Sequence, residues 1–230
     1  MKIQSYAETN NANALSAKQK LGSQGTLRLD WIPNFSFTNP DDWGLALPTN
    51  IDQKNIPCEL LEVYKRFFDI GFIDRYGAEC IMMSKILRRV LRLHGIEAYT
   101  RQVVFQLENE TKGWRYTMGG ENQLLENNRI DVHMIVAARG YILDFSQRRL
   151  HSYFGFTAPI AFIGPDDPST YFGNMIDFGS FGNATWIPRR PLNDHVRHSV
   201  YMNKAEEIRA SREYFDYYNM RPYISKDPNV

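Results

Sequence analysis

Cysteine and long apolar runs are both scarce in this chain of 230 residues. Two cysteines do not make a disulfide scaffold, and so few thiols are typical of a protein of the reducing cytoplasm. No run reaches the roughly 18 apolar residues of a membrane span, and residues 1–25 lack the apolar block of a secretory signal. We therefore expect a cytoplasmic protein with no membrane partner.

A strong charge of one sign is also absent. The net charge is +1 and the isoelectric point is about 7.8, so the chain as a whole offers no electrostatic reason to bind nucleic acid. Apolar residues make up 43% of the chain and charged residues 23%, as in ordinary globular proteins. The composition predicts a folded protein whose partner is not a nucleic acid.

The distribution of large apolar residues predicts one domain behind a flexible arm. Residues 1–25 contain few such residues, so we expect the arm there. A chain of this length buries one sizeable core, which predicts a single domain over residues 26–230. Regular patterns concentrate in a core of about 57–150. Residues 151–230 are aromatic and rich in Gly and Pro, which indicates an irregular extension with one helix at 204–218.

Within this core, the apolar spacing predicts two helices followed by strands. Helical spacing runs over Pro57–Gly71 and again from about Ala78–His94. Ile96–Leu107 is rich in β-branched and aromatic residues, which favours a strand, and Arg129–Phe145 has the pattern of a β-hairpin. Residues 108–128 are polar and rich in Gly, and are expected to form a loop or the ragged end of a hairpin. The sequence thus predicts an α+β fold, with a helix packed on an antiparallel sheet and irregular segments at both ends.

Cys80 lies in the first turn of the second predicted helix. Unpaired N–H groups and the helix dipole favour a thiolate there, whereas the adjacent carboxylate of Glu79 disfavours it. A thiolate is a strong nucleophile, but most lone cysteines pack as small apolar residues, and both interpretations are open for Cys80. Cys58 also begins a helix, but no catalytic pattern follows it, so we expect Cys58 in the core.

The predicted hairpin brings His133 and Asp144 together. If Arg139-Gly140 forms a two-residue turn, Ala138 pairs with Tyr141. This register makes His133 and Asp144 diagonal neighbours on one face, within reach of each other. The carboxylate could then hold one ring nitrogen and leave the other to a thiol. A turn with an odd number of residues would separate the two side chains.

Other residues compete for these two roles. Asp131 lies two residues before His133 on the same strand face and is a rival for the orienting carboxylate. His151 follows the hairpin and is a rival for the imidazole. In a purely structural alternative, His133 is a half-buried histidine and Asp144 caps the turn at Ser146-Gln147.

The segment Glu79-Cys80-Ile-Met-Met-Ser-Lys-Ile-Leu-Arg-Arg-Val-Leu-Arg-Leu-His-Gly95-Ile96-Glu-Ala98 resembles the cysteine-bearing helix of the transglutaminase-like superfamily. In that family a helix of Leu and Arg leads to Gly-Ile-x-Ala and a strand. Val132-His133-Met-Ile-Val and Tyr141-Ile-Leu-Asp144 resemble the family's His strand and Asp strand. The resemblance covers roughly residues 76–146, and the arylamine N-acetyltransferases, papain-like relatives, have a similar layout.

The resemblance implies a papain-like fold with a catalytic triad. By position, Cys80 is the nucleophile, His133 the general base and acid, and Asp144 the residue that orients the imidazole. Such a site cleaves or transfers an amide or peptide acyl group, with hydrolysis favoured, and needs neither a metal nor an organic cofactor. The implied partner is a peptide or amide substrate, either free or within a protein. Candidates for a side-chain donor to the oxyanion are Gln53, Trp43 and Tyr76.

Three further interpretations come from the residues. A binding or scaffold protein could keep this fold without turnover and use the aromatic C-terminal residues for recognition. An acyltransferase like the arylamine N-acetyltransferases is another reading, although no nucleotide-binding segment is recognisable. His195 and His198 have the spacing of metal ligands on a helix, but no carboxylate or cysteine set completes them, which favours a surface pair.

Overall fold

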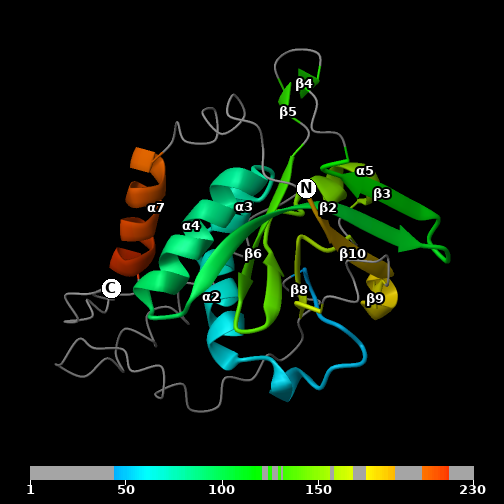
Figure 1. The fold of residues 1–230 in the computed structure, drawn as a ribbon, viewed down its shortest axis with the longest axis horizontal. Helices are drawn as coiled ribbons and strands as arrows, with labels where there is room; N and C mark the ends of the chain where they lie inside the picture. The colour runs from blue at the N-terminus through cyan, green and yellow to red at the C-terminus, as the bar shows by residue number, and fades with distance from the viewer. Residues whose placement is uncertain are drawn as a thin grey trace, which may run out of the picture.

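We describe the protein from a computed structural model over residues 44–120, 124–125, 129–130, 132–155, 158–167, 175–189 and 204–217. The predicted arm at 1–25 lies outside these ranges. Figure 1 shows a group of helices beside a strongly curved sheet. Within the described ranges, no helix has the length and apolarity that a membrane span requires.

Four helices pack together beside the sheet. α2 spans Cys58–Asp69 and α4 spans Cys80–Leu93, which confirms the two helices predicted for the core. α3, Phe72–Tyr76, lies between them and begins after Gly71, whose φ of 78° turns the chain out of α2. α7, Lys204–Tyr217, packs against α4 and confirms the helix predicted near residue 204.

The described strands form a large sheet of eight strands and a separate pair. The order in the large sheet is β1-β8-β7-β6-β2-β10-β9, and β3 pairs with β2. β1 runs parallel to β8 and the other neighbours are antiparallel, so the sheet is mixed where a wholly antiparallel one was predicted. The fold is nevertheless α+β, as expected. The strands are β1 (Leu45–Ala46), β2 (Ala98–Asn109), β3 (Trp114–Met118), β4 (Leu124–Leu125), β5 (Arg129–Ile130), β6 (His133–Ala138), β7 (Tyr141–Asp144), β8 (Ala161–Pro165), β9 (Ile176–Asp177) and β10 (Asn183–Pro188).

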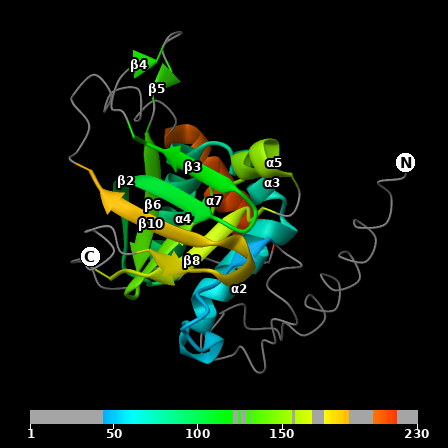
Figure 2. The ribbon, with the colours of Figure 1, turned by 90° about the vertical axis from the view of Figure 1, so that its right-hand side faces the viewer.

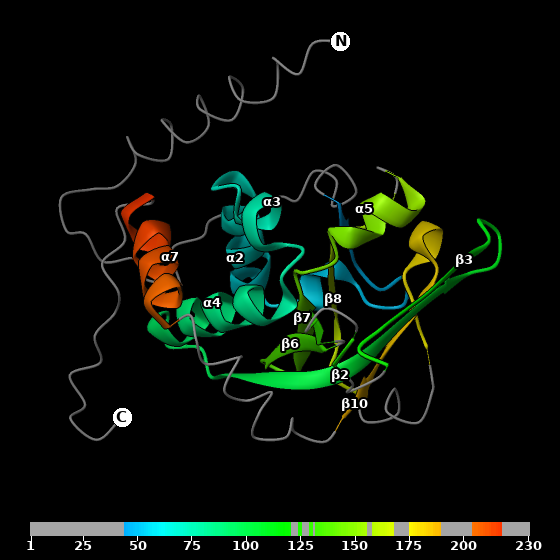
Figure 3. The same cartoon turned by 90° about the horizontal axis from the view of Figure 1, so that it is seen from above.

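The large sheet curls until its two ends meet. The backbone N–H of Thr49, just after β1, donates to the carbonyl of Asp177 in β9 at 2.9 Å, and the Thr49 hydroxyl donates to the Asp177 carboxylate at 2.7 Å. Phe162 of β8 and Trp186 of β10 are separated by three strands in the sheet order, yet their ring centroids lie 5.7 Å apart. Figures 2 and 3 show this curvature from two further directions. Side chains from distant strands therefore meet inside the curve.

Apolar cores lie on both faces of the curled sheet. One core lies between the sheet and the four helices, and the other fills the inside of the curve. Alternate residues of the β6–β7 hairpin enter different cores, with Val136 in the first and Ile135 and Ile142 in the second. By the same alternation, His133 and Asp144 face the inside of the curve.

The hairpin register is the predicted one. Ala138 pairs with Tyr141, and the residues at the turn, Arg139 and Gly140, have φ of 54° and 78°. Two consecutive positive φ angles are those of a type I′ turn, whose twist matches that of the strands it joins. The two-residue turn therefore places His133 and Asp144 on one face.

The chain beyond the hairpin is more regular than its composition indicated. β8 and β10 enter the large sheet from the range predicted to be an irregular extension. The short helices α5 (Arg149–Phe154) and η5 (Gly179–Phe181) lie in the same range. Most of the described aromatic rings there are buried, although Tyr153 is 65% exposed. At residues 108–120, β2 continues to Asn109 and pairs with β3, so of the two predicted alternatives the chain forms a hairpin there.

Candidate active site

His133 and Asp144 form a buried pair at the start of β6 and the end of β7. The Nε2 atom of His133 lies 2.7 Å from the Oδ2 atom of Asp144, and both side chains are 0% exposed. The contact spans the diagonal of the hairpin, as the register predicted. One nitrogen of the imidazole is therefore fixed by a carboxylate.

The Asp144 carboxylate receives several donors besides His133. On Oδ2, the amide nitrogen of Gln147 donates at 2.6 Å and the indole N–H of Trp186 at 2.9 Å. On Oδ1, the hydroxyl of Ser146 donates at 3.0 Å and its backbone N–H at 3.3 Å. Asp144 thus caps the turn at Ser146 and also bonds to the imidazole of His133. Five donors around one carboxylate hold it in a single orientation.

The pair is electrostatically coupled. Burial alone would lower the pKa of His133, but the Asp144 carboxylate outweighs burial and raises it above its ordinary value. Burial would raise the pKa of Asp144, but His133, Trp186 and Gln147 together hold it below its ordinary value. The pair therefore favours an imidazolium beside a carboxylate.

Cys80 is the first residue of α4 and reaches the same place from the helix side. Its Sγ donates to the carbonyl of Val132 at 3.1 Å, and the hydroxyl of Ser84, one turn later, donates to the carbonyl of Met134 at 2.7 Å. Pairing between β6 and β7 begins at Val136, and the two earlier carbonyls accept hydrogen bonds from side chains of α4. These two hydrogen bonds hold the start of α4, and with it the Cys80 thiol, against the start of β6.

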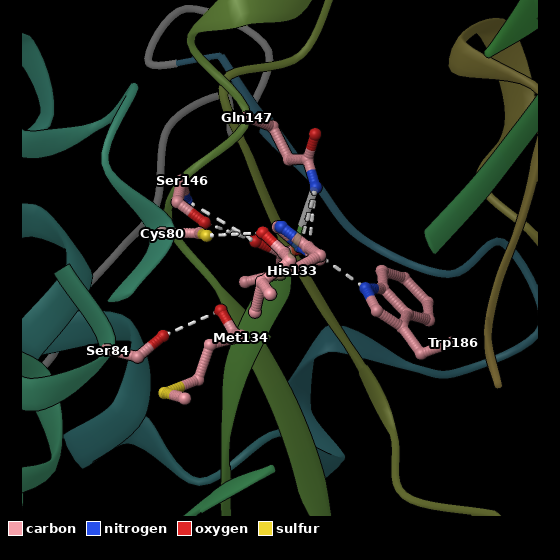
Figure 4. A network of polar contacts seen from close by, with 9 residues as sticks. Cys80, Ser84, His133, Met134, Ser146, Gln147 and Trp186 are labelled. Atoms are coloured by element: carbon pink, nitrogen blue, oxygen red, sulfur yellow. Dashed lines mark hydrogen bonds and ion pairs between the residues drawn. The ribbon is translucent and has the colours of Figure 1, made fainter. Parts of the chain in front are cut away.

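The second ring nitrogen of His133 lies on the thiol side. Nδ1 is buried and forms no hydrogen bond with any described residue. Cys80 is nevertheless close enough to the ring to contribute, after Asp144, to the raised pKa of His133. Figure 4 shows the Cys80 sulfur on one side of the ring and the Trp186 indole on the other. The three residues predicted from the sequence are therefore brought together.

Gly119 packs against the backbone of His133. Its φ is 77°, and an added Cβ would lie 2.5 Å from the carbonyl oxygen of Val103 and 2.9 Å from the backbone nitrogen of His133. No side chain fits at that position without moving β2 or β6. The glycine at the end of β3 therefore fixes where His133 sits.

The other sequence candidates lie elsewhere. Cys58 was predicted in the core but is exposed, with its thiol 3.6 Å from the Glu59 carboxylate. The Tyr76 hydroxyl donates to the Glu206 carboxylate of α7. Gln53 is exposed in the helix η3, Gln53–Asn55. His151 bonds through Nε2 to the Ala158 carbonyl at 2.8 Å. Asp131, Trp43, His195 and His198 lie outside the described residues.

Sequence reasoning missed two residues of the site, Trp186 and Gln147. Thr185-Trp186-Ile187 has the composition of a strand, but nothing in the sequence indicates that this strand pairs with β2. Gln147 was noted only as part of a turn. Both residues donate a hydrogen bond to Oδ2 of Asp144.

Comparisons with known proteins give this site no functional precedent. No protein-family model matches the chain. No curated protein matches it either. A crystal structure described only as that of a genomics target is 12% identical, with a TM-score of 0.43, and the alignment covers 76% of this chain and 83% of that one. Any function must therefore be argued from the site.

Proposed function

We propose that the protein is a thiol-dependent acyl-transfer enzyme with a papain-like, transglutaminase-like core, in which Cys80, His133 and Asp144 act as a triad. The substrate is an amide or peptide acyl group, and hydrolysis is favoured because water needs no second binding site. The observation that carries the proposal is the His133 ring, held by Asp144 through Nε2 while Nδ1 lies unbonded on the thiol side.

The proposed reaction starts from an ion pair in which the Cys80 proton is already on Nδ1 of His133, and the thiolate sulfur attacks the carbonyl carbon. The carbon–sulfur bond forms as the carbonyl becomes an oxyanion. The Cys80 backbone N–H, in the first turn of α4, is placed to donate to that oxyanion. His133 then returns its proton to the leaving amine, the carbon–nitrogen bond breaks, and a thioester remains on Cys80.

In the second half, water replaces the amine. Nδ1 of His133 accepts a proton from the water as its oxygen attacks the thioester. The carbon–sulfur bond breaks, the acid product leaves, and the proton stays on His133, which restores the pair of thiolate and imidazolium. With an amine in place of water, the same steps transfer the acyl group.

A catalytically silent scaffold of the same fold is the second candidate. Two observations favour it: the thiol donates to the Val132 carbonyl, and the His133–Asp144 pair is fully buried. For turnover, the Cys80 side chain must leave Val132 and turn towards Nδ1. In a scaffold the thiol keeps its proton and stays on the carbonyl.

Alkylation by iodoacetamide separates the two candidates, with Cys58 as the internal control. At pH 6 an ordinary thiol of pKa about 8.5 is less than about 1% thiolate, and the pKa of Cys58 is raised further by burial and by Glu59. A Cys80 thiolate paired with an imidazolium should react about 100-fold faster than Cys58. Mass spectrometry of the labelled peptides gives the ratio of the two rates.

His133→Ala should bring this ratio down to near one, because the proton acceptor is lost. His151→Ala is the matched control and should leave the ratio unchanged, since His151 bonds to Ala158 and is not part of the triad. Equal rates for Cys80 and Cys58 in the wild type would reject the enzyme and favour the scaffold.

A further inference from the structure

Trp186 approaches the candidate site from a part of the chain far from the predicted triad. It lies in the middle of β10, where it pairs with Phe105 of β2, and it is fully buried. Its ring lies in a cage inside the curved sheet, 5.4 Å from Phe105, 5.7 Å from Phe162 and 5.8 Å from Phe178 between centroids. This cage fixes the direction in which the indole N–H points.

The indole N–H donates to the oxygen that faces His133. Trp186 Nε1 lies 2.9 Å from Asp144 Oδ2, and His133 Nε2 lies 2.7 Å from the same atom. Phe105 also contacts the His133 ring, with centroids 5.8 Å apart. The aromatic cage therefore keeps water from the His133–Asp144 pair on the side opposite to the thiol.

A carboxylate in such surroundings needs donors to remain charged. Burial in an apolar environment favours the protonated acid, and hydrogen bonds to the anion oppose this effect. Bonds to an ionised group are also the strong ones. Among the described residues that donate to Oδ2, only Trp186 comes from outside the hairpin and the residues just after it.

We propose that Trp186 is a positioning residue that acts through Asp144, keeping its carboxylate ionised and turned towards His133. The role rests on the function proposed above, since it makes the imidazolium available to the Cys80 thiolate. The hydrogen bond of the Trp186 indole goes to Asp144 and its ring packs on Phe105, Phe162 and Phe178. Removing the indole N–H should therefore shift the pH dependence of Cys80 alkylation, and not only lower its rate.

The test is the pH profile of Cys80 alkylation in Trp186→Phe, which keeps an aromatic ring and removes the donor. Asp144 should then bind a proton at higher pH, and the thiolate should be lost at higher pH with it. The acid limb of the profile is expected to move up by about one pH unit, the size of one bond to a charged group. Trp114→Phe, the same change in another buried tryptophan, should leave the limb in place.

A second readout does not depend on the thiol. In Cys80→Ala protein, the ring signals of His133 in NMR should report the acid transition of the His133–Asp144 pair, and Trp186→Phe should move that transition up by a similar amount. Trp186→3-benzothienylalanine, which has a sulfur in place of the indole N–H, repeats the test with the ring shape preserved.

The outcomes separate the two proposals. A wild-type Cys80 no faster than Cys58 rejects the proposed enzyme, whatever Trp186 does. An acid transition of His133 that stays in place or moves to lower pH in both Trp186 variants rejects the role of Trp186, even where Cys80 is reactive.

Discussion

Two helices of this protein begin with a cysteine, and the two cysteines have different surroundings. Cys58 opens α2 and Cys80 opens α4, so the helix dipole acts on both thiols in the same sense. Cys58 is exposed, and the partial burial of its thiol, followed by the charge of Glu59, raises its pKa. Cys80 lies beside His133. A helix N-terminus therefore does not by itself define a nucleophile, and the imidazole makes the difference.

Asp144→Asn should abolish the difference between the two thiols. The change removes the buried charge that supports the imidazolium, so the alkylation ratio of Cys80 to Cys58 at pH 6 should fall by about 100-fold, to near one. Breaking a buried charge pair should also lower the free energy of unfolding by about 3 to 5 kcal/mol. Urea unfolding and peptide mapping measure the two effects.

Asp177→Asn is the control for this substitution. Asp177 is an exposed carboxylate at the end of β9, bonded to Thr49 and to the backbone N–H of Gly179. Its replacement should cost about 1 kcal/mol at most and leave the ratio unchanged. Full stability and an unchanged ratio in Asp144→Asn would contradict the coupling described for the pair.

His94, at the C-terminal end of α4, makes the stability of the fold depend on pH. Burial, followed by the charge of Arg66, lowers the pKa of His94 from 6.5 to about 4. In the unfolded chain His94 therefore binds a proton below about pH 6.5, whereas in the folded protein it binds one only below about pH 4. Stability is present above pH 6.5 and should be lost as the pH falls through this window, by about 3 kcal/mol in total.

His133 does not mask this loss. Its pKa is raised in the folded state, so its contribution is fully present below the unfolded value and is lost only as the pH rises. Urea unfolding at pH 7 and pH 4.5 measures the change, and His94→Leu should reduce it. A wild-type stability that is flat over this window would show that His94 is not held neutral.

The smallest expected effect comes from the acid beside the control thiol. Glu59→Gln removes a charge that raises the pKa of Cys58, so Cys58 alkylation at pH 7 should speed up by about two- to fivefold. Cys80 should keep its rate, because Glu59 lies beside Cys58 at the start of α2 and beside Arg139 at the turn of the hairpin, the end of the hairpin opposite to His133. An unchanged Cys58 rate would mean that burial, and not Glu59, sets the reactivity of that thiol.

The local features of the site could be predicted from the sequence because local rules determine them. The Arg139-Gly140 turn fixes the register, and the register fixes the diagonal of His133 and Asp144. The start of α4 was placed within two residues, which located Cys80 at a helix N-terminus. These inferences required only periodicity and turn chemistry.

The remaining features depend on pairings between distant segments. That β10 lies beside β2, or that β1 runs parallel to β8, cannot be read from the composition of either strand. The curl of the sheet brings Trp186 to Asp144, and no local sequence pattern predicts this contact. Cys58 was misplaced for a related reason, since an apolar helix face does not reveal which terminal residue it leaves in solvent.

The position of Trp186 along the chain has a consequence for biosynthesis. The ribosome makes the thiol first, then the imidazole and the carboxylate, and makes the indole about a hundred residues after Cys80. At about 5–20 residues per second, the nascent chain carries Cys80 for roughly 5 to 20 seconds before β10 exists. Because the Asp144 carboxylate lacks the Trp186 donor until β10 docks on β2, the hydrogen bonds around His133 and Asp144 are completed only after β10 has been synthesised and paired.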